Sequence, residues 1–156
     1  MRVPSLSLLW LEELRAEGVQ ALLLDLDNTL CDPRGDSPTE EAAAFCVRME
    51  EAGMRGYILT NGRGDRAERL AQRLGLPCIA RAHKPLPGAY RRALRDLDLP
   101  KEAVAAVGDQ FFTDGLGAMY VGIRLVLVEP RFPRDKPLVR LLSPLDRILR
   151  RLIPER

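Results

Sequence analysis

The chain has 156 residues, the size of a single domain with a full hydrophobic core. Its apolar fraction of 46% and charged fraction of 29% are typical of a folded globular protein and exclude an intrinsically disordered one. A net charge of +2 gives no electrostatic reason to expect nucleic-acid binding. The scattered cysteines Cys31, Cys46 and Cys78 form neither a disulfide framework nor a metal-binding spacing, so we expect a reducing, cytoplasmic environment.

Hydrophobic periodicity predicts strands that alternate with helices along most of the chain. In chain order the pattern predicts a helix at 6–17, a strand at 21–24, a helix at 38–52, a strand at 56–59, a helix at 64–74, a strand at 77–80, a helix at 88–97, a strand at 104–107, a short helix at 113–119 and a strand at 125–128. This alternation predicts an α/β, three-layer, Rossmann-like sandwich with a mostly parallel five-stranded sheet. We expect one domain over residues 1–156, in which residues 131–156 form a basic amphipathic C-terminal extension.

Two acidic residues, Asp25 and Asp27, follow directly after the first predicted strand. This strand is apolar throughout, as expected for a buried parallel strand, and the carboxyl ends of such strands form a ligand-binding crevice. Two carboxylates this close favour a bound cation or a shared proton. Asn28 is suited to the turn that would bring both carboxylates to one substrate, because asparagine tolerates unusual backbone angles.

The later strands end in polar residues as well. Thr60 and Asn61 follow the second strand, Lys84 follows the third, and Asp109 and Asp114 follow the fourth. Because the carboxyl ends of parallel strands lie along one edge of a sheet, we expect these side chains to meet at one site. Carboxylate oxygens suit Mg²⁺, and an ammonium group and a hydroxyl group suit a phosphate, so the sequence predicts a site for phosphoryl transfer.

In this order, the same residues resemble the four motifs of the haloacid dehalogenase superfamily of phosphatases. The matching segments are Asp25–Thr29, Thr60-Asn61, Lys84-Pro85 and Gly108–Asp114. They are most similar to the small YqeG-like proteins of subfamily IIIA, to which the phosphatidylglycerophosphate phosphatases are related. The resemblance implies a Mg²⁺-dependent phosphatase that hydrolyses a phosphomonoester through an aspartyl-phosphate intermediate, with phosphatidylglycerophosphate as a candidate substrate.

The resemblance also implies a role for each matched residue. Asp25 would be the nucleophile and Asp27 the general acid/base. Asp25, the backbone carbonyl of Asp27 and Asp109 would hold Mg²⁺. Thr60, Asn61 and Lys84 would bind the phosphoryl group, and the acid Asp114 would support them. The intervals between the motifs leave no room for a cap domain, so we expect an open site.

Several alternatives stay open at this stage. A soluble phosphorylated metabolite or nucleotide is an alternative substrate to a lipid. A receiver-type phosphoacceptor domain also combines Asp, Thr and Lys, although here an acid pair follows Lys84. A non-catalytic binding module is a third possible class of protein. Each of these classes is compatible with a homo-oligomer. His83 is expected to be a loop residue, because a lone histidine rarely builds a metal site.

Two basic stretches admit more than one interpretation. Residues 131–156 carry eight Lys/Arg and three Asp/Glu, with leucines at helical spacing. Such a helix can pack on the sheet or on a second subunit, or can make peripheral contact with an anionic membrane, and we favour packing. On the helix after the second strand, Arg63, Arg66, Arg69 and Arg73 share one side, which we interpret as a solvated face.

Overall fold

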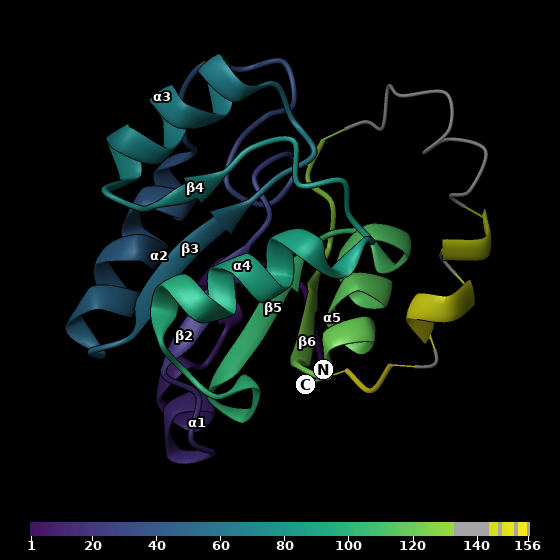
Figure 1. Ribbon diagram of the computed structural model, residues 1–156. Helices are drawn as coiled ribbons and strands as arrows, with labels where there is room; N and C mark the ends of the chain where they lie inside the picture. Colours follow the sequence, from purple (N-terminus) through teal and green to yellow (C-terminus); the bar gives the residue numbers. More distant parts are fainter. Residues whose placement is uncertain (133–143, 147, 152, 156) are drawn as a thin grey trace.

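The computed structural model describes residues 1–132, 144–146, 148–151 and 153–155. In these residues the strands form one six-stranded sheet with the order β1-β6-β5-β2-β3-β4. All of its pairings are parallel (Figure 1). The strands are β1 (Arg2–Val3), β2 (Ala21–Leu24), β3 (Arg55–Leu59), β4 (Cys78–Ile79), β5 (Val104–Gly108) and β6 (Arg124–Val128).

Helices cover both faces of the sheet and give the fold three layers (Figure 1). The α-helices labelled in Figure 1 are α1 (Leu11–Ala16), α2 (Glu40–Glu51), α3 (Gly64–Leu74), α4 (Pro87–Leu97) and α5 (Leu116–Val121). Leu22 and Leu24 of β2 pack in the cluster that contains side chains of α1, α2 and α3, whereas Leu23 packs in the cluster of α4 and α5. Successive strand residues point to opposite faces, so a strand buried on both sides must be apolar throughout. The predicted three-layer α/β fold is confirmed.

The sheet has one strand more than predicted. Strand β1 pairs with β6 at the edge of the sheet, with Arg2 opposite Leu127 and Val3 opposite Val128. Two residues are too short for an alternating pattern, so only the presence of the neighbouring strand reveals this one. The sequence prediction of five strands was therefore wrong by this edge strand.

Two predicted helix boundaries also differ from the structure. The predicted helix at 6–17 is interrupted at Leu9, whose backbone is extended, and divides into a 3₁₀ turn and α1. Helix α2 begins two residues later than predicted, because Thr39 is its N-cap: the Thr39 hydroxyl accepts a hydrogen bond from the backbone N–H of Ala42 at 3.1 Å.

The chain leaves β2 through a left-handed turn, as predicted, with Asn28 at φ = 66°. Asp25 still takes part in the sheet, since its N–H donates to the carbonyl of Val107 at 2.8 Å. The chain then forms a short loop and α2. Residues 28–83 are all described and contain no inserted domain, so the site at the carboxyl edge of the sheet has no cap of its own.

The described part of the C-terminal extension buries two charged side chains and leaves two of its apolar side chains exposed. Residues 144–146 and 148–151 are helical and are called the C-terminal segment below. In this segment Leu145 and Ile148 are 48% and 57% exposed, whereas Asp146 and Arg150 are buried. The leucines predicted at 138, 141, 142 and 152 lie outside the described residues.

Close packing between α4 and α5 gives a test of the core. A Cβ added to Gly117 would lie 2.4 Å from the ring of the buried Tyr90, whereas one added to Gly88 of α4 would meet nothing within 4 Å. We expect Gly117→Ala to lower the free energy of unfolding by about 1–3 kcal/mol, as overpacking does in well-packed cores. Gly88→Ala should not lower it. Urea denaturation of both variants measures the difference, and equal stabilities would contradict this packing.

Candidate active site

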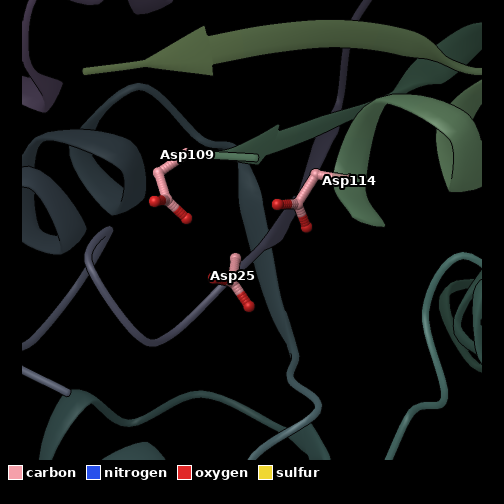
Figure 2. Close-up of side chains that lie close together, drawn as sticks. All are labelled: Asp25, Asp109 and Asp114. Atoms are coloured by element: carbon pink, nitrogen blue, oxygen red, sulfur yellow. The ribbon is translucent and has the colours of Figure 1, made fainter. Parts of the chain in front are cut away.

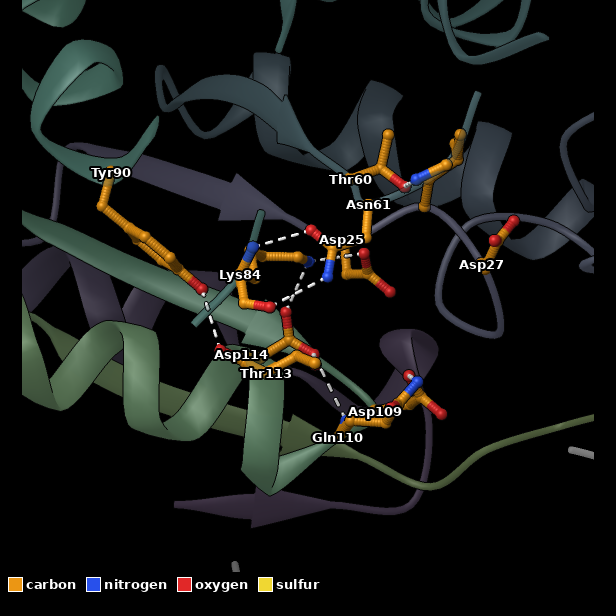
Figure 3. Close-up of polar contacts among 12 residues, drawn as sticks. Asp25, Asp27, Thr60, Asn61, Lys84, Tyr90, Asp109, Gln110, Thr113 and Asp114 are labelled. Atoms are coloured by element: carbon orange, nitrogen blue, oxygen red, sulfur yellow. Dashed lines mark hydrogen bonds and ion pairs between the residues drawn. The ribbon is translucent and has the colours of Figure 1, made fainter. Parts of the chain in front are cut away.

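A buried lysine joins two carboxylates at the carboxyl edge of the sheet. The Nζ of Lys84 lies 2.6 Å from Oδ1 of Asp25, at the end of β2, and 2.6 Å from Oδ1 of Asp114, after β5 (Figure 3). All three residues are less than 10% exposed. Burial raises the pKa of Asp25 to about 7, against the opposing effect of Lys84. Burial would lower the pKa of Lys84, but the carboxylates of Asp114 and Asp25 outweigh it and raise this pKa.

Three acidic side chains converge at this point. Asp25, Asp109 and Asp114 each place one carboxylate oxygen within 4.8 Å of the other two (Figure 2). Against the single ammonium of Lys84, these three carboxylates leave two negative charges when all are ionised. Such a set of hard oxygen ligands with an excess negative charge fits a divalent cation such as Mg²⁺.

Thr60 and Asn61, which follow β3, make different contacts. The hydroxyl oxygen of the buried Thr60 accepts a hydrogen bond from the N–H of Gly62 at 3.0 Å, which holds the turn in place. The side-chain amide of Asn61 pairs with the backbone of Lys84, accepting from its N–H at 2.7 Å and donating to its carbonyl at 3.0 Å. The Asn61 side chain thus positions Lys84, a task that the sequence did not indicate, and phosphate binding by Asn61 stays a prediction.

The second acid of the first motif lies apart from the cluster around Lys84 (Figure 3). The Asp27 carboxylate pairs instead with the guanidinium of Arg66 on α3 at 2.7 Å. The other nitrogens of Arg66 donate to the carbonyls of Asp32 at 2.7 Å and Gly35 at 2.9 Å. A guanidinium can bind several acceptors in fixed directions, so Arg66 holds Asp27 and the following loop together.

The contacts of Arg66 show that the arginine side of α3 is not a purely solvated face, so that interpretation of the sequence was wrong for Arg66. A second arginine on the same side, Arg73, also contacts this loop, donating to the carbonyl of Asp36 and to the hydroxyl of Ser37. The spacing of the arginines gives no sign of these contacts, because they depend on where the loop returns over α3.

Tyr90 is a further residue near the site that the sequence did not indicate. Its ring is buried, and its hydroxyl group donates to the carbonyl of Thr113 at 3.4 Å. Burial, followed by the neighbouring carboxylate of Asp114, raises the pKa of this phenol. Tyr90 occupies an inward position of an amphipathic helix, so the sequence pattern indicates a core residue and gives no sign that it lies near the site.

Of the predicted site residues, the structure brings Asp25, Lys84, Asp109 and Asp114 together, with Asn61 paired to the Lys84 backbone. Thr60 lies in the neighbouring turn, and the side chain of Asp27 is held by Arg66. Fold and site together define an α/β protein with a candidate active site at the carboxyl edge of a parallel sheet.

Comparison with known proteins is consistent with this class. The family model of the haloacid dehalogenase-like hydrolases matches residues 11–122. A curated relative, "Probable phosphatase YqeG" of Bacillus subtilis (strain 168), is 32% identical over 136 residues, which cover 87% of this chain and 79% of the relative. The chain belongs to the haloacid dehalogenase-like hydrolases.

Solved structures of other proteins share the fold. CbbY from Rhodobacter sphaeroides, in complex with phosphate, aligns with a TM-score of 0.59 at 20% identity, covering 76% of this chain and 89% of CbbY. A hydrolase of the haloacid dehalogenase-like family from Brucella suis 1330 aligns with a TM-score of 0.56 at 13% identity, covering 75% and 90%. The family and the hydrolytic enzyme predicted from the four motifs are both confirmed.

The contacts of Arg66 predict a local effect on the loop after the first motif. Arg66→Met removes the donors to two carbonyls and to Asp27, so we expect amides in residues 32–36 to exchange with solvent about tenfold faster or more. Arg69→Met is the matched control, because Arg69 is exposed on the same helix. Hydrogen exchange that is equally fast in the wild type and both variants would contradict the clamp.

Proposed function

We propose that this protein is a Mg²⁺-dependent phosphatase that hydrolyses a phosphomonoester through an aspartyl-phosphate intermediate. The observation that carries the proposal is the buried Lys84 held between Asp25 and Asp114, beside the third carboxylate of Asp109. An ammonium group at the end of a strand supplies positive charge for phosphoryl oxygens, and an adjacent carboxylate can act as the nucleophile. The phosphatase name of the YqeG relative supports the same reaction.

The first half-reaction transfers the phosphoryl group to the protein. The Oδ1 atom of Asp25 pairs with Lys84. A carboxylate oxygen of Asp25 attacks phosphorus while the bond from phosphorus to the ester oxygen breaks. Asp27, which would exchange its contact with Arg66 for the ester oxygen, gives a proton to the departing alkoxide, which leaves as an alcohol. Lys84 and the hydroxyl group of Thr60 bind the equatorial oxygens, where negative charge accumulates in the transition state.

The second half-reaction restores the enzyme. A water molecule attacks phosphorus, Asp27 takes a proton from this water, and the bond from phosphorus to the Asp25 oxygen breaks. The products are inorganic phosphate and the free Asp25 carboxylate. Asp114 contributes through Lys84, whose ammonium it holds at 2.6 Å.

The acidic group fits the proposed metal. Asp25, Asp109 and the backbone carbonyl of Asp27 would hold Mg²⁺, which when bound reduces the repulsion between the phosphoryl group and the nucleophile. The support lies in the chemistry of the donors, since carboxylate oxygens from separate segments converge and carry excess negative charge.

The open site leaves room for a large substrate, and we propose phosphatidylglycerophosphate as one candidate beside soluble phosphorylated metabolites and nucleotides. The support is the exposure of Leu145 and Ile148 on the C-terminal segment, next to the exposed cation Arg151. Apolar and basic side chains of this kind favour peripheral contact with an anionic lipid surface. In the described residues no helix is long and apolar enough to cross a membrane.

The reaction is tested with an aryl phosphate, with and without Mg²⁺. We expect hydrolysis that depends on the metal, that Asp25→Asn abolishes and that Asp27→Asn reduces by about 10²-fold or more. Asp65→Asn, an exposed carboxylate on α3, should retain full activity. Stable phosphorylation of Asp25 without turnover would instead identify a phosphoacceptor module. If aryl phosphate is not hydrolysed, vesicles that contain phosphatidylglycerophosphate test the lipid directly.

The buried Asp25 predicts a pH dependence of stability in the metal-free protein. A carboxyl whose pKa rises from 3.8 to about 7 on folding contributes stability that is present below pH 3.8 and is lost as the pH approaches 7. Asp25→Asn should therefore show a smaller fall in unfolding free energy between pH 4 and pH 7 than the wild type. Urea denaturation with a chelator present measures this, and Asp65→Asn should keep the wild-type slope.

A further inference from the structure

The C-terminal segment contains two buried charged side chains that the proposed reaction does not use. Asp146 is 3% exposed and Arg150 is 4% exposed, although they belong to the most basic stretch of the chain. Long charged side chains are rarely buried unless they are paired. Their partners therefore indicate what the segment does.

Both side chains bind the loop that carries Asp109. The carboxylate of Asp146 accepts a hydrogen bond from the backbone N–H of Phe111 at 2.8 Å. One nitrogen of the Arg150 guanidinium donates to the backbone carbonyl of Asp109 itself. The other nitrogen donates to the carbonyl of Val128 at 2.8 Å and pairs with Glu129 at 2.9 Å.

These contacts fix successive backbone groups of a single loop. The carbonyl of Asp109 is held by Arg150, the N–H of Gln110 by the Asp114 carboxylate at 3.3 Å, and the N–H of Phe111 by Asp146. The middle contact comes from the active site, whereas the outer two come from a segment more than 30 residues further along the chain. Because a side chain starts from its backbone, these contacts limit where the Asp109 carboxylate can lie.

We propose that the C-terminal segment braces the metal-binding loop, with Asp146 and Arg150 as positioning residues that hold the Asp109 carboxylate toward Asp25 and Asp114. The brace deepens the proposed function and rests on its assignment of Asp109 as a metal ligand. A partner that orients a metal ligand typically changes metal affinity by about 10- to 100-fold when it is removed. In this way the segment would support the active site through the backbone of the loop that carries Asp109.

The experiment measures two quantities on the full-length, metal-free protein. Mn²⁺ binding, followed by electron paramagnetic resonance, gives the dissociation constant without any substrate. Hydrogen exchange gives the protection of the amides of Gln110 and Phe111. The variants are Asp146→Ala, Asp146→Asn and Arg150→Met, and the matched control is Arg151→Met, which removes the same charge from an exposed position of the segment.

We expect Asp146→Ala and Arg150→Met to weaken Mn²⁺ binding by about tenfold or more and to speed exchange at Phe111, while Arg151→Met matches the wild type. Asp146→Asn keeps an oxygen that can accept from Phe111 and should restore most of both quantities. If Asp146→Ala or Arg150→Met fails to fold, Arg150→Lys is measured instead. It keeps the charge, but one ammonium cannot reach all three oxygens that Arg150 contacts. An intermediate loss is then expected.

Two results would count against the proposals separately. Wild-type Mn²⁺ affinity and wild-type exchange in Asp146→Ala and Arg150→Met would overturn the brace. A wild-type protein that binds no Mn²⁺ would overturn the metal-dependent function, and the exchange of the Gln110 and Phe111 amides would then decide on the brace alone.

Discussion

The pairing of Lys84 with Asp25 and Asp114 is the interaction on which the rest of the site depends. It joins three segments that are distant in sequence: the end of β2, the loop after β4 and the turn after β5. Without an ammonium between them, two buried carboxylates would repel each other and would lose their hydration uncompensated. Asn61 adds to the pairing by holding the Lys84 backbone at both its N–H and its carbonyl.

The same pairing leaves the site short of positive charge. Lys84 can neutralise one carboxylate, and the acidic group contains three. Burial raises the pKa of Asp25, so this carboxyl holds a proton more readily than a free one, and the proton reduces the negative charge of the metal-free cluster. In the proposed function, a divalent cation bound at this cluster would favour the ionised form of the Asp25 carboxylate. Stability of the metal-free site and readiness for catalysis are thus opposed, as is usual where charges are gathered for chemistry.

Arginine side chains fix the loops that surround this cluster. Arg66 reaches from α3 to Asp27 and to two carbonyls of the following loop, and Arg150 reaches from the C-terminal segment to the carbonyls of Asp109 and Val128. Each guanidinium serves several acceptors at once in fixed directions, because its donors lie in one rigid plane. Residues 28–83 contain no inserted cap domain, so these contacts within the domain are what hold the described loops beside the site.

The sequence by itself determined the alternation of strands and helices and the placement of acids at the strand ends, because both are local properties of the chain. Parallel connection then brings Asp25, Lys84 and Asp109 to one edge of the sheet. Only the tertiary structure decided that β1 exists, that Arg66 holds Asp27, and that Asp146 and Arg150 of the C-terminal segment are buried. Each of these depends on a partner brought close by folding, and a pattern along the chain carries no information about where that partner will lie.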